Sequence, residues 1–433
     1  MDTGTAVPPS PRRRTAALAA LALSAFVVGT SELVVVGLLP LIARDVHVSI
    51  AGSGQLVTAY ALGIAIGGPI LSALTTRLNR RRLLLLTVTA YIAGNALTAA
   101  SADMTMVLVV RVATGAVHGL FIGVASIVAA GLVPPEQRGR AMSMVFGGIA
   151  VSTVVGVPLG TLLGQALGWR AAFLAIAALG TAALACAAAL VPAVAGGGMA
   201  GLAIQARSAF APRVLAMLGV GVLLLGGQFT AFTYLAPYLQ AVVGVTGGGI
   251  SAFLLAYGVA SAIGTFLGGR FADRGASATL LAGNAALVVA LGGLWAAGAS
   301  MPVAVLALGV WGLAGLGLVP SLQLRVVGLA GSGRDLAATL GASAVNAGIA
   351  IGALVGGSAV AARGVHTVAL VAAAVCAVAL PATLATRWLK VPAEQAAPPA
   401  TPVAAPAIAV ACRGVCLVDA GTAAATIAYQ QAR

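Results

Sequence analysis

Twelve long apolar runs constrain the fold of this sequence more than any other feature. A transmembrane α-helix needs about 20 predominantly apolar residues. The runs that approach or exceed this length are 15–42, 50–75, 83–101, 105–131, 140–165, 170–191, 211–241, 248–270, 277–299, 301–324, 336–362 and 365–388. Only 7% of the residues are charged, whereas a soluble domain has about 25%. The sequence therefore predicts an all-α membrane protein with twelve transmembrane helices.

The twelve spans form two groups of six, and the flanking segments differ from them in composition. The expected parts are an N-terminal segment 1–14, an N-terminal half 15–191, a linker 192–210, a C-terminal half 211–390 and a tail 391–433. The tail is rich in Pro and Ala, and we expect it to be disordered. The first apolar run is too long for the core of a cleavable signal peptide, which is about 7–15 residues.

The basic residues indicate how the chain crosses the membrane. If both termini lie inside, 17 of the 23 basic residues fall in inner loops or at inner helix ends. The outer loops then hold three, which are Arg44, Arg170 and Arg363. Cytoplasmic loops are enriched in Lys and Arg. We therefore expect both termini in the cytoplasm, and we interpret the +14 net charge as a topology signal rather than a nucleic-acid patch.

The two halves resemble copies of one unit. At an offset of 197 residues, Gly29, Pro40, Tyr60 and Arg77 recur as Gly226, Pro237, Tyr257 and Arg274. Small residues at every fourth position recur in spans five and eleven, at Gly148, Ser152, Gly156, Gly160 and Gly164 and at Ala344, Gly348, Gly352 and Gly356. Such stripes let helices approach closely in lipid. Because each half has an even number of spans, we predict parallel repeats related by an axis along the membrane normal.

Glu32, in the stretch GTSELVVVGLLP, is the one acidic residue inside a predicted span. A charge at the bilayer centre is costly, and apolar surroundings favour a neutral carboxyl group. A carboxyl group that takes up and releases a proton is what proton exchange requires. Arg111 is the one Lys or Arg in the interior of a span, away from the span ends, and helix geometry predicts that it lies within about 6 Å of the depth of Glu32.

Three roles remain open for Glu32. It is a proton carrier whose contact with Arg111 forms and breaks, a substrate contact without proton transfer, or a static ion pair that fixes packing. His118 shares a helical face with Arg111, and histidine titrates in the working range of pH. His118 is therefore a candidate proton relay, or else a neutral side chain bonded to a backbone carbonyl.

Span seven, GGQFTAFTYLAPYLQ, combines aromatic and polar residues. This combination suits a site for a flat, partly apolar molecule, so we predict that the substrate cavity is lined by Gln228, Phe229, Phe232 and Tyr234, with simple packing as the alternative. Asn95 and Asn346 also lie inside spans. Each either faces the cavity or forms a hydrogen bond between helices.

Four segments carry a family resemblance, GTSELVVVGLLP, RVATGAVHGLFIGVASIVAAGLVPPEQRGRA, GVPLGTLLGQALGWRAAF and GGQFTAFTYLAPYL. On these segments the chain resembles the major facilitator superfamily, and within it the twelve-span drug:proton antiporters. The similarity spans about 15–390 and looks closest to the branch of chloramphenicol-resistance, arabinose-efflux and purine or nucleoside-efflux proteins. It implies a functional arginine at Arg111 and a first-span acid near Glu32.

A loop motif of that family occurs twice. The second copy keeps Gly269, Asp273 and Arg274, while the first copy keeps Arg77, Arg80 and Arg81 but has Thr76 in place of the aspartate. In the family this loop latches the two halves together through charge pairs. The resemblance therefore implies a gating role for these residues, weakened in the first copy.

The fifth-span antiporter motif of the family, a Gly-Pro kink on a glycine stripe, appears as Gly156, Pro158 and Gly160, with Val157 inserted between Gly156 and Pro158. Val154 and Leu41 stand where this branch often has an asparagine and an acid. Both departures remove polar groups that are able to contact substrate or proton.

The resemblance implies a proton-coupled secondary transporter that exports small organic molecules, of drug or antibiotic type, across a bacterial cytoplasmic membrane by alternating access. Efflux of a sugar, purine or nucleoside by the same fold is the alternative. An enzyme is not expected, because the spans contain no HExxH, paired carboxylates or Ser/His/Asp set. A P-loop is absent from the sequence, which argues against an ATP-driven pump, and a sensor would need a signalling domain.

We expect no cofactor and no metal. Cys412 and Cys416 form a CxxxC in the tail, and this spacing matches no common zinc or redox motif. The expected partners are a small-molecule substrate, protons and the lipid bilayer, and we expect a monomer.

Overall fold

The computed structural model describes residues 11–192 and 207–390, and no strand occurs in either range. Eleven helices in these ranges are long and apolar enough to cross a membrane. One of them, α12 (Gly248–Ala297), contains both predicted spans eight and nine, and its backbone leaves helical geometry at Gly275 (φ 176°, ψ 82°). The prediction of twelve transmembrane helices is therefore confirmed. The predicted tail, with Cys412 and Cys416, lies outside the described residues.

The N-terminal half begins with the 35-residue helix α1. Its helices are α1 (Pro11–Asp45), α2 (Ile50–Leu62), α3 (Gly68–Leu74), α4 (Arg80–Ala100), α5 (Met104–Gly131), α6 (Arg138–Val151), α7 (Val157–Leu167) and α8 (Trp169–Leu190). Side-chain caps start several of them, because Ser49, Asn79 and Asp103 accept hydrogen bonds from the free N–H groups of the first turn of α2, α4 and α5. Ser49 and Asp103 stand directly before apolar runs, whereas three arginines follow Asn79, so α4 begins three residues before the predicted run 83–101.

The C-terminal half repeats this arrangement. Its helices are α10 (Pro212–Phe232), α11 (Leu235–Tyr238), α12, α13 (Met301–Leu329), α14 (Arg334–Arg363) and α15 (Thr367–Ala385). Span seven is interrupted between α10 and α11 at Thr233–Tyr234. Pro237 lies four residues after Thr233, and a proline removes the helical hydrogen bond to the carbonyl four residues before it. Pro40, the repeat counterpart of Pro237, lies inside the continuous helix α1.

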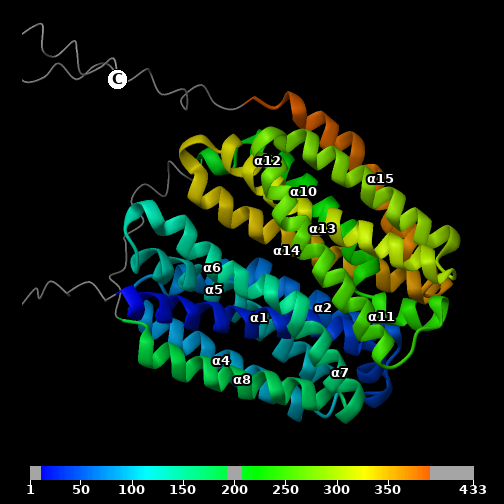
Figure 1. The fold of residues 1–433 in the computed structure, drawn as a ribbon, viewed down its shortest axis with the longest axis horizontal. Helices are drawn as coiled ribbons and strands as arrows, with labels where there is room; N and C mark the ends of the chain where they lie inside the picture. The colour runs from blue at the N-terminus through cyan, green and yellow to red at the C-terminus, as the bar shows by residue number, and fades with distance from the viewer. Residues whose placement is uncertain (1–10, 193–206, 391–433) are drawn as a thin grey trace, which may run out of the picture. The chain divides into compact units, whose positions relative to one another are not determined.

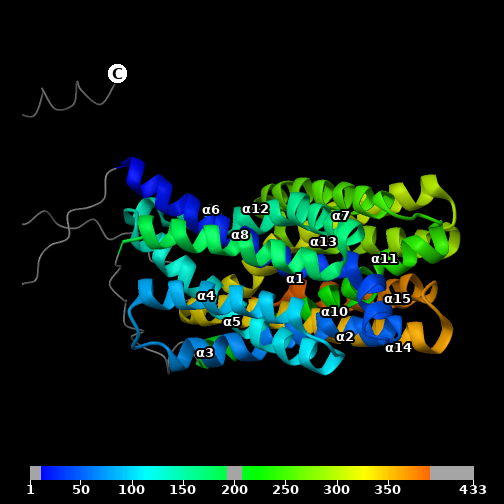
Figure 2. The ribbon, with the colours of Figure 1, turned by 90° about the horizontal axis from the view of Figure 1, so that it is seen from below.

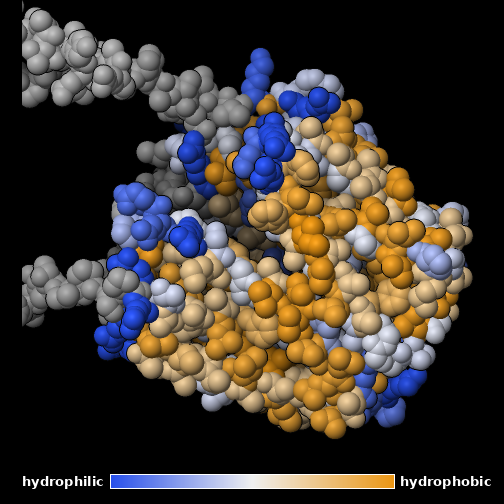
Figure 3. Space-filling view, in the orientation of Figure 1, coloured by the Kyte–Doolittle hydropathy of each residue, from blue (hydrophilic) through white to orange (hydrophobic). Residues whose placement is uncertain are grey.

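Each half forms its own helical bundle (Figures 1 and 2). α1, α4, α5, α6 and α8 lie side by side in one bundle, and α10, α12, α13, α14 and α15 in the other. The surface is hydrophobic over its middle, and hydrophilic residues gather toward its ends (Figure 3). This distribution is the one expected of helices whose middle sections face lipid.

The two small-residue stripes have equivalent packing roles. A side chain at Gly156 would collide with Thr30 in α1, and one at its repeat counterpart Gly352 would collide with the backbone carbonyl of Gly226 in α10. The stripe of span five therefore lets α6 and α7 lie against α1, as the stripe of span eleven lets α14 lie against α10. This matching contact confirms that the halves are structural repeats.

The two halves meet on two sides: α2 lies against α14, and α12 lies against span five, where a side chain at Gly258 would collide with the carbonyl of Thr153. The Tyr234 hydroxyl donates to the carbonyl oxygen of Ala353 at 3.1 Å and lies 3.5 Å from that of Ala51 in the other half. Thr58 donates to the Ala350 carbonyl at 3.4 Å. Between the halves the surface is hollowed on the side where α1 begins (Figure 3). The halves are thus joined near the start of α2 and separate toward the start of α1.

Candidate transport site

The Glu32 side chain faces the seam between the two halves. It is 19% exposed and lines a cavity of about 10 Å³ whose other walls are Leu33, Val36, Val57, Tyr60, Ala61, Phe229 and Ile349. A cavity of this volume holds about one water molecule. Because Phe229 and Ile349 belong to the C-terminal half, the carboxyl group lies where the halves approach each other.

A chain of polar side chains leads away from this carboxyl group. Its Oε2 atom lies 3.8 Å from Nδ1 of His118. That Nδ1 atom is 2.9 Å from the hydroxyl of Tyr60, which is 2.7 Å from the hydroxyl of Tyr91. The four side chains come from α1, α5, α2 and α4, so the N-terminal bundle brings together residues that are remote in sequence.

The end of this chain is a backbone contact. The hydroxyl of Tyr91 lies 2.9 Å from the carbonyl oxygen of Val28 in α1. The hydroxyl of Tyr60 is placed to donate to one of its two partners, Tyr91 and His118, and to accept from the other. The hydrogen-bond partner found for His118 is thus a tyrosine hydroxyl, and its part in a proton relay stays a prediction.

Arg111 lies at the depth of Glu32 but does not bind its carboxylate. The buried guanidinium donates to the backbone carbonyls of Ser31 at 3.0 Å and Glu32 at 3.3 Å, and its Cζ atom lies 3.9 Å from the Tyr60 ring centroid. The carboxylate Oε2 atom instead lies 3.8 Å from Nδ1 of His118, a contact that is an ion pair only when the histidine is protonated. The static Glu32–Arg111 pair is therefore not formed in this structure, because the guanidinium binds the main chain of α1.

Asn95 lies beside this group and connects two helices. Its amide donates to the carbonyl of Tyr91 at 2.8 Å, and its Oδ1 accepts from the hydroxyl of Ser31 at 2.6 Å. The side chain is buried. Of the two roles considered for Asn95, the structure shows the hydrogen bond between α1 and α4.

The C-terminal half contributes an aromatic cluster. Phe229 lines the same cavity as Glu32, and its ring centroid is 5.2 Å from that of Phe232. Phe232 contacts Tyr257 at 4.8 Å and Trp311 at 6.0 Å. Sequence reasoning missed Tyr257 and Trp311 as neighbours of the site. The repeat of Tyr60 as Tyr257 was a usable signal, whereas no motif marked Trp311.

Other residues predicted to line the cavity have hydrogen-bond partners elsewhere. Gln228 is buried, and its amide lies 3.3 Å from the carbonyl of Leu224 in its own helix and 3.5 Å from that of Gly315 in α13. Tyr234 joins the two halves as described above. The amide of Asn346 donates to the carbonyl of Ala342, also in its own helix. The cavity beside Glu32 is lined by Phe229 but by none of these three.

The antiporter-motif residues of span five support α1 on both sides of Glu32. Ser152–Gly156 is a π-helical turn, and Pro158 lies in the first turn of α7, where a proline is tolerated. A side chain at Gly156 would collide with Thr30, and one at Gly160 would lie 2.7 Å from Val34. These glycines therefore fix how closely the Glu32 segment is held by span five.

The predicted gating residues make contacts within their own halves. Arg81 donates to the carbonyls of Val191 and Ala188 at 2.6 Å each, which ties α4 to the end of α8. Arg80 is buried, and Arg77 is exposed. In the second copy of the motif, Gly269 is partly buried, Asp273 and Arg274 are exposed, and the Arg274 guanidinium lies 6.0 Å from the Phe271 ring centroid. Their role in latching the halves stays a prediction.

The described residues contain no group of three or more His, Cys, Asp or Glu side chains that could hold a metal ion. The polar atoms at the site are instead carboxylate, imidazole, phenol and guanidinium groups at or near hydrogen-bond distance of one another. Such a set is able to move protons and to bind polar parts of a small molecule.

Comparison with known proteins identifies the family. A family model described as Major Facilitator Superfamily matches residues 21–330 and 217–429. The MFS-type transporter YtbD of Bacillus subtilis (strain 168) is 39% identical over 346 residues, 79% of this chain and 87% of YtbD. The inner membrane transport protein YdhP of Escherichia coli (strain K12) is 35% identical over 345 residues, 80% and 89% of the two chains. The chloramphenicol resistance protein of Streptomyces lividans is 34% identical over 340 residues, 77% and 86%.

Solved structures share the fold at low sequence identity. The nucleoside transporter NupG superposes with a TM-score of 0.71 at 15% identity, covering 86% of this chain and 99% of NupG. A bacterial homologue of the human lysosomal transporter Spinster, in an inward-facing and occupied conformation, gives 0.68 at 18% identity, covering 87% and 94%. Together with the twelve spans in two repeated halves, these similarities show that the chain is a multi-pass membrane protein and belongs to the major facilitator superfamily, a family of transporters rather than enzymes.

Proposed function

We propose that this transporter exports small organic molecules in exchange for protons, and that Glu32 carries the proton. The observation that supports this most is the placement of the Glu32 carboxyl group. It lines a cavity between the two halves and forms no hydrogen bond or arginine ion pair among the described residues. A carboxylate held permanently in an ion pair would be fixed in one charge state, whereas this one is free to change.

His118 is the relay in this proposal. Its Nδ1 atom lies 3.8 Å from the Glu32 carboxylate and 2.9 Å from the Tyr60 hydroxyl, so a small movement of α1 brings the carboxylate and the imidazole into hydrogen-bond distance. Arg111 grips the carbonyls on the Glu32 turn and thereby couples the position of this turn to α5. Movement of the halves then changes the surroundings of the carboxyl group, and this change alters its affinity for a proton.

We assign substrate binding to the face of the C-terminal half opposite Glu32. Phe229 is at the cavity, and the rings of Phe232, Tyr257 and Trp311 stand behind it. Aromatic walls with few polar groups suit a flat, partly apolar molecule. The 34% identity to a chloramphenicol resistance protein supports an antibiotic-type substrate. The distribution of basic residues supports a bacterial cytoplasmic membrane with both termini inside.

Proton release on substrate binding tests this proposal. Purified protein in weakly buffered detergent is mixed with chloramphenicol and with other flat organic molecules, and binding and pH change are measured on the same samples. Glu32→Gln is compared with Glu136→Gln, which makes the same chemical change at an exposed position outside the spans. We expect proton release from the wild type and from the control, and none from Glu32→Gln. Substrate binding with undiminished release from Glu32→Gln would overturn the assignment of Glu32.

A further inference from the structure

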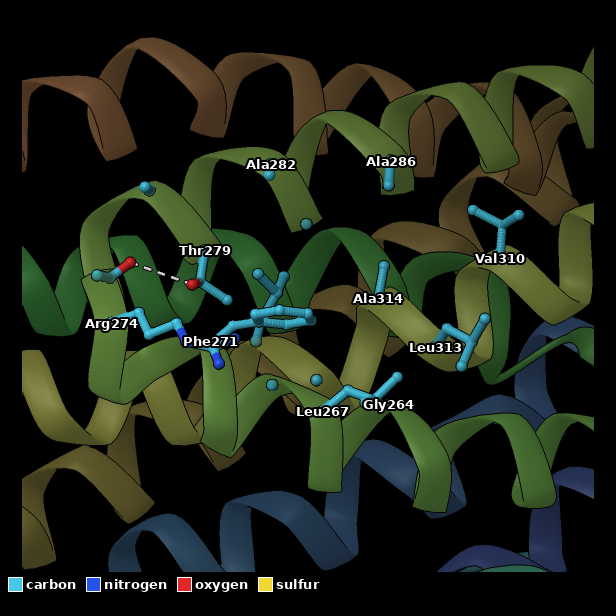
Figure 4. A pocket seen from close by; sticks show the side chains of 16 residues that line it. Gly264, Leu267, Phe271, Arg274, Thr279, Ala282, Ala286, Val310, Leu313 and Ala314 are labelled. Atoms are coloured by element: carbon cyan, nitrogen blue, oxygen red, sulfur yellow. Dashed lines mark hydrogen bonds between the residues drawn. The ribbon is translucent and has the colours of Figure 1, made fainter.

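An open groove lies on the C-terminal half, away from the site of Glu32. It has a volume of about 580 Å³ and is formed by α13 and the two limbs of α12 on either side of Gly275. Figure 4 shows Arg274 and Phe271 at one end and Ala286, Leu313 and Val310 toward the other. The volume falls within the range of about 300–1,000 Å³ that is typical of ligand sites.

Small residues on three helical segments form this groove. A side chain at Gly264 would collide with the carbonyl of Leu313, and one at Gly268 with that of Gly317, so the first limb of α12 touches the backbone of α13. The second limb faces the groove with Ala278, Ala282, Gly283 and Ala286, which are too short to fill it. The groove therefore results from the small residues that the sequence places on these helices.

The length of the groove is apolar. Thr279 is its one hydroxyl-bearing residue, and this hydroxyl donates to the carbonyl of Gly275 at 3.1 Å. Ala278 and Ala282 are exposed, as are Leu267 and Phe271. These residues belong to helices that cross the membrane, so the medium that reaches the groove is the hydrocarbon of lipid chains.

Charge gathers at one end of the groove only. Arg274 is its one charged lining residue, it is exposed, and it directly precedes the break at Gly275 where the first limb ends. Arg270 and Asp273, both exposed, are its charged neighbours on the same limb, and the three together carry one net positive charge. The guanidinium thus stands at the end of a span, where lipid headgroups lie.

We propose that this groove binds an anionic phospholipid. One acyl chain lies along Ala278, Ala282 and Ala286 against α13, and the phosphate group pairs with Arg274. The apolar length of the groove matches the acyl chain of such a lipid, and its basic end matches the anionic headgroup. Basic pockets between transmembrane helices bind such headgroups. The bound acyl chain fills the space that the small side chains of the second limb of α12 leave empty. The proposal is independent of how Glu32 functions.

Native mass spectrometry of the full chain, released from detergent, tests the proposal. Phosphatidylglycerol is titrated against phosphatidylcholine of the same acyl chains, and melting temperature is measured in parallel. Arg274→Gln removes the headgroup contact, and Ala282→Phe fills the groove. The matched controls are Arg270→Gln and Ala285→Phe, which change exposed residues of α12 that do not line the groove.

We expect one phosphatidylglycerol to bind the wild type in preference to phosphatidylcholine and to raise its melting temperature. Arg274→Gln should weaken phosphatidylglycerol binding about fivefold, and Ala282→Phe should remove the preferred site, with both controls unchanged. Inorganic phosphate alone should not raise the melting temperature. Equal binding of both lipids to all five proteins, or an equal loss in Arg270→Gln and Arg274→Gln, would overturn the proposal in favour of a general lipid shell.

Discussion

The two halves of the molecule share a backbone plan and differ in chemistry at equivalent positions. At the offset of 197 residues, Glu32 corresponds to Phe229 and Arg111 to Leu308, while Tyr60 corresponds to Tyr257. Tyr60 is hydrogen-bonded to His118 and Tyr91, and Tyr257 packs against the rings of Phe232 and Trp311. The repeat keeps the close contacts between helices, whereas the residues at positions 32 and 229, which line the shared cavity, differ between the halves.

This difference indicates a division of labour between the halves. The N-terminal half concentrates the ionisable groups around α1, and the C-terminal half presents aromatic rings on α10, α12 and α13. Both sets reach one cavity, since Glu32 and Phe229 line it together. A repeat that keeps its packing is free to change its seam-facing residues, because these contribute little to the glycine contacts that hold each bundle together.

The largest effect is expected from moving the acid between the halves. Glu32→Gln should reduce proton-driven export from loaded proteoliposomes to the level of empty vesicles. Adding Phe229→Glu, which puts the acid on the equivalent position of the other half, should not restore export, because His118 and Tyr60 would still surround position 32. Export and binding are measured on the single and double variants. Restored export in the double variant would show that the cavity, and not the N-terminal network, determines coupling.

The second prediction replaces Arg111 by its repeat counterpart. Arg111→Leu should abolish export while the melting temperature stays the same or rises, because leucine removes a buried charge that no carboxylate pairs with. Arg111→Lys should also lose export, since a single ammonium group does not reproduce the two-pronged grip on the carbonyls of Ser31 and Glu32. Melting curves and export assays separate the two effects. A large loss of stability in Arg111→Leu would mean that the guanidinium mainly holds the bundle together.

The fold was predictable from the sequence because hydropathy is a local property. Twelve apolar runs were enough to place twelve spans, and the glycine stripes indicated which helices pack closely. The partners around Glu32 were not predictable in the same way. A depth estimate brought Arg111 to the level of Glu32, but the choice between carboxylate and main-chain carbonyls depends on the side-chain geometry in the bundle.

The tyrosines were missed for a physical reason as well. Inside an apolar run, Tyr60 and Tyr91 count as hydrophobic residues, and only the fold shows that their hydroxyls meet His118 and Val28. Trp311 gave no signal, since its role depends on α13 lying beside α10 and the first limb of α12. Sequence reasoning thus recovered the charged members of the site and lost those whose polar atom is a small part of an apolar side chain.

The third prediction tests the equivalence of the stripes. Gly156→Val and Gly352→Val, at repeat counterparts, should each destabilise the protein by about 3 kcal/mol, because each introduces a side chain against Thr30 of α1 or the backbone carbonyl of Gly226 of α10. Gly147→Val is the control, since nothing lies within 4 Å of a side chain there. Thermal unfolding in detergent measures the three variants. Very different losses at Gly156 and Gly352 would show that the halves are not equivalent in stability.

The smallest effect on stability is expected from the two tyrosines at equivalent positions of the repeat, Tyr60 and Tyr257. Tyr60→Phe removes the hydroxyl that joins His118 to Tyr91, and leaving a buried donor without a partner should destabilise the protein by about 1–2 kcal/mol. Tyr257→Phe keeps the ring contacts with Phe232 and Trp311, so its effect on stability should be smaller. The two variants should also differ in ligand assays. Tyr60→Phe should alter proton release, and Tyr257→Phe should alter only the affinity for substrate. Equal effects of both variants on proton release would contradict the division of labour, because the aromatic half would then take part in moving the proton.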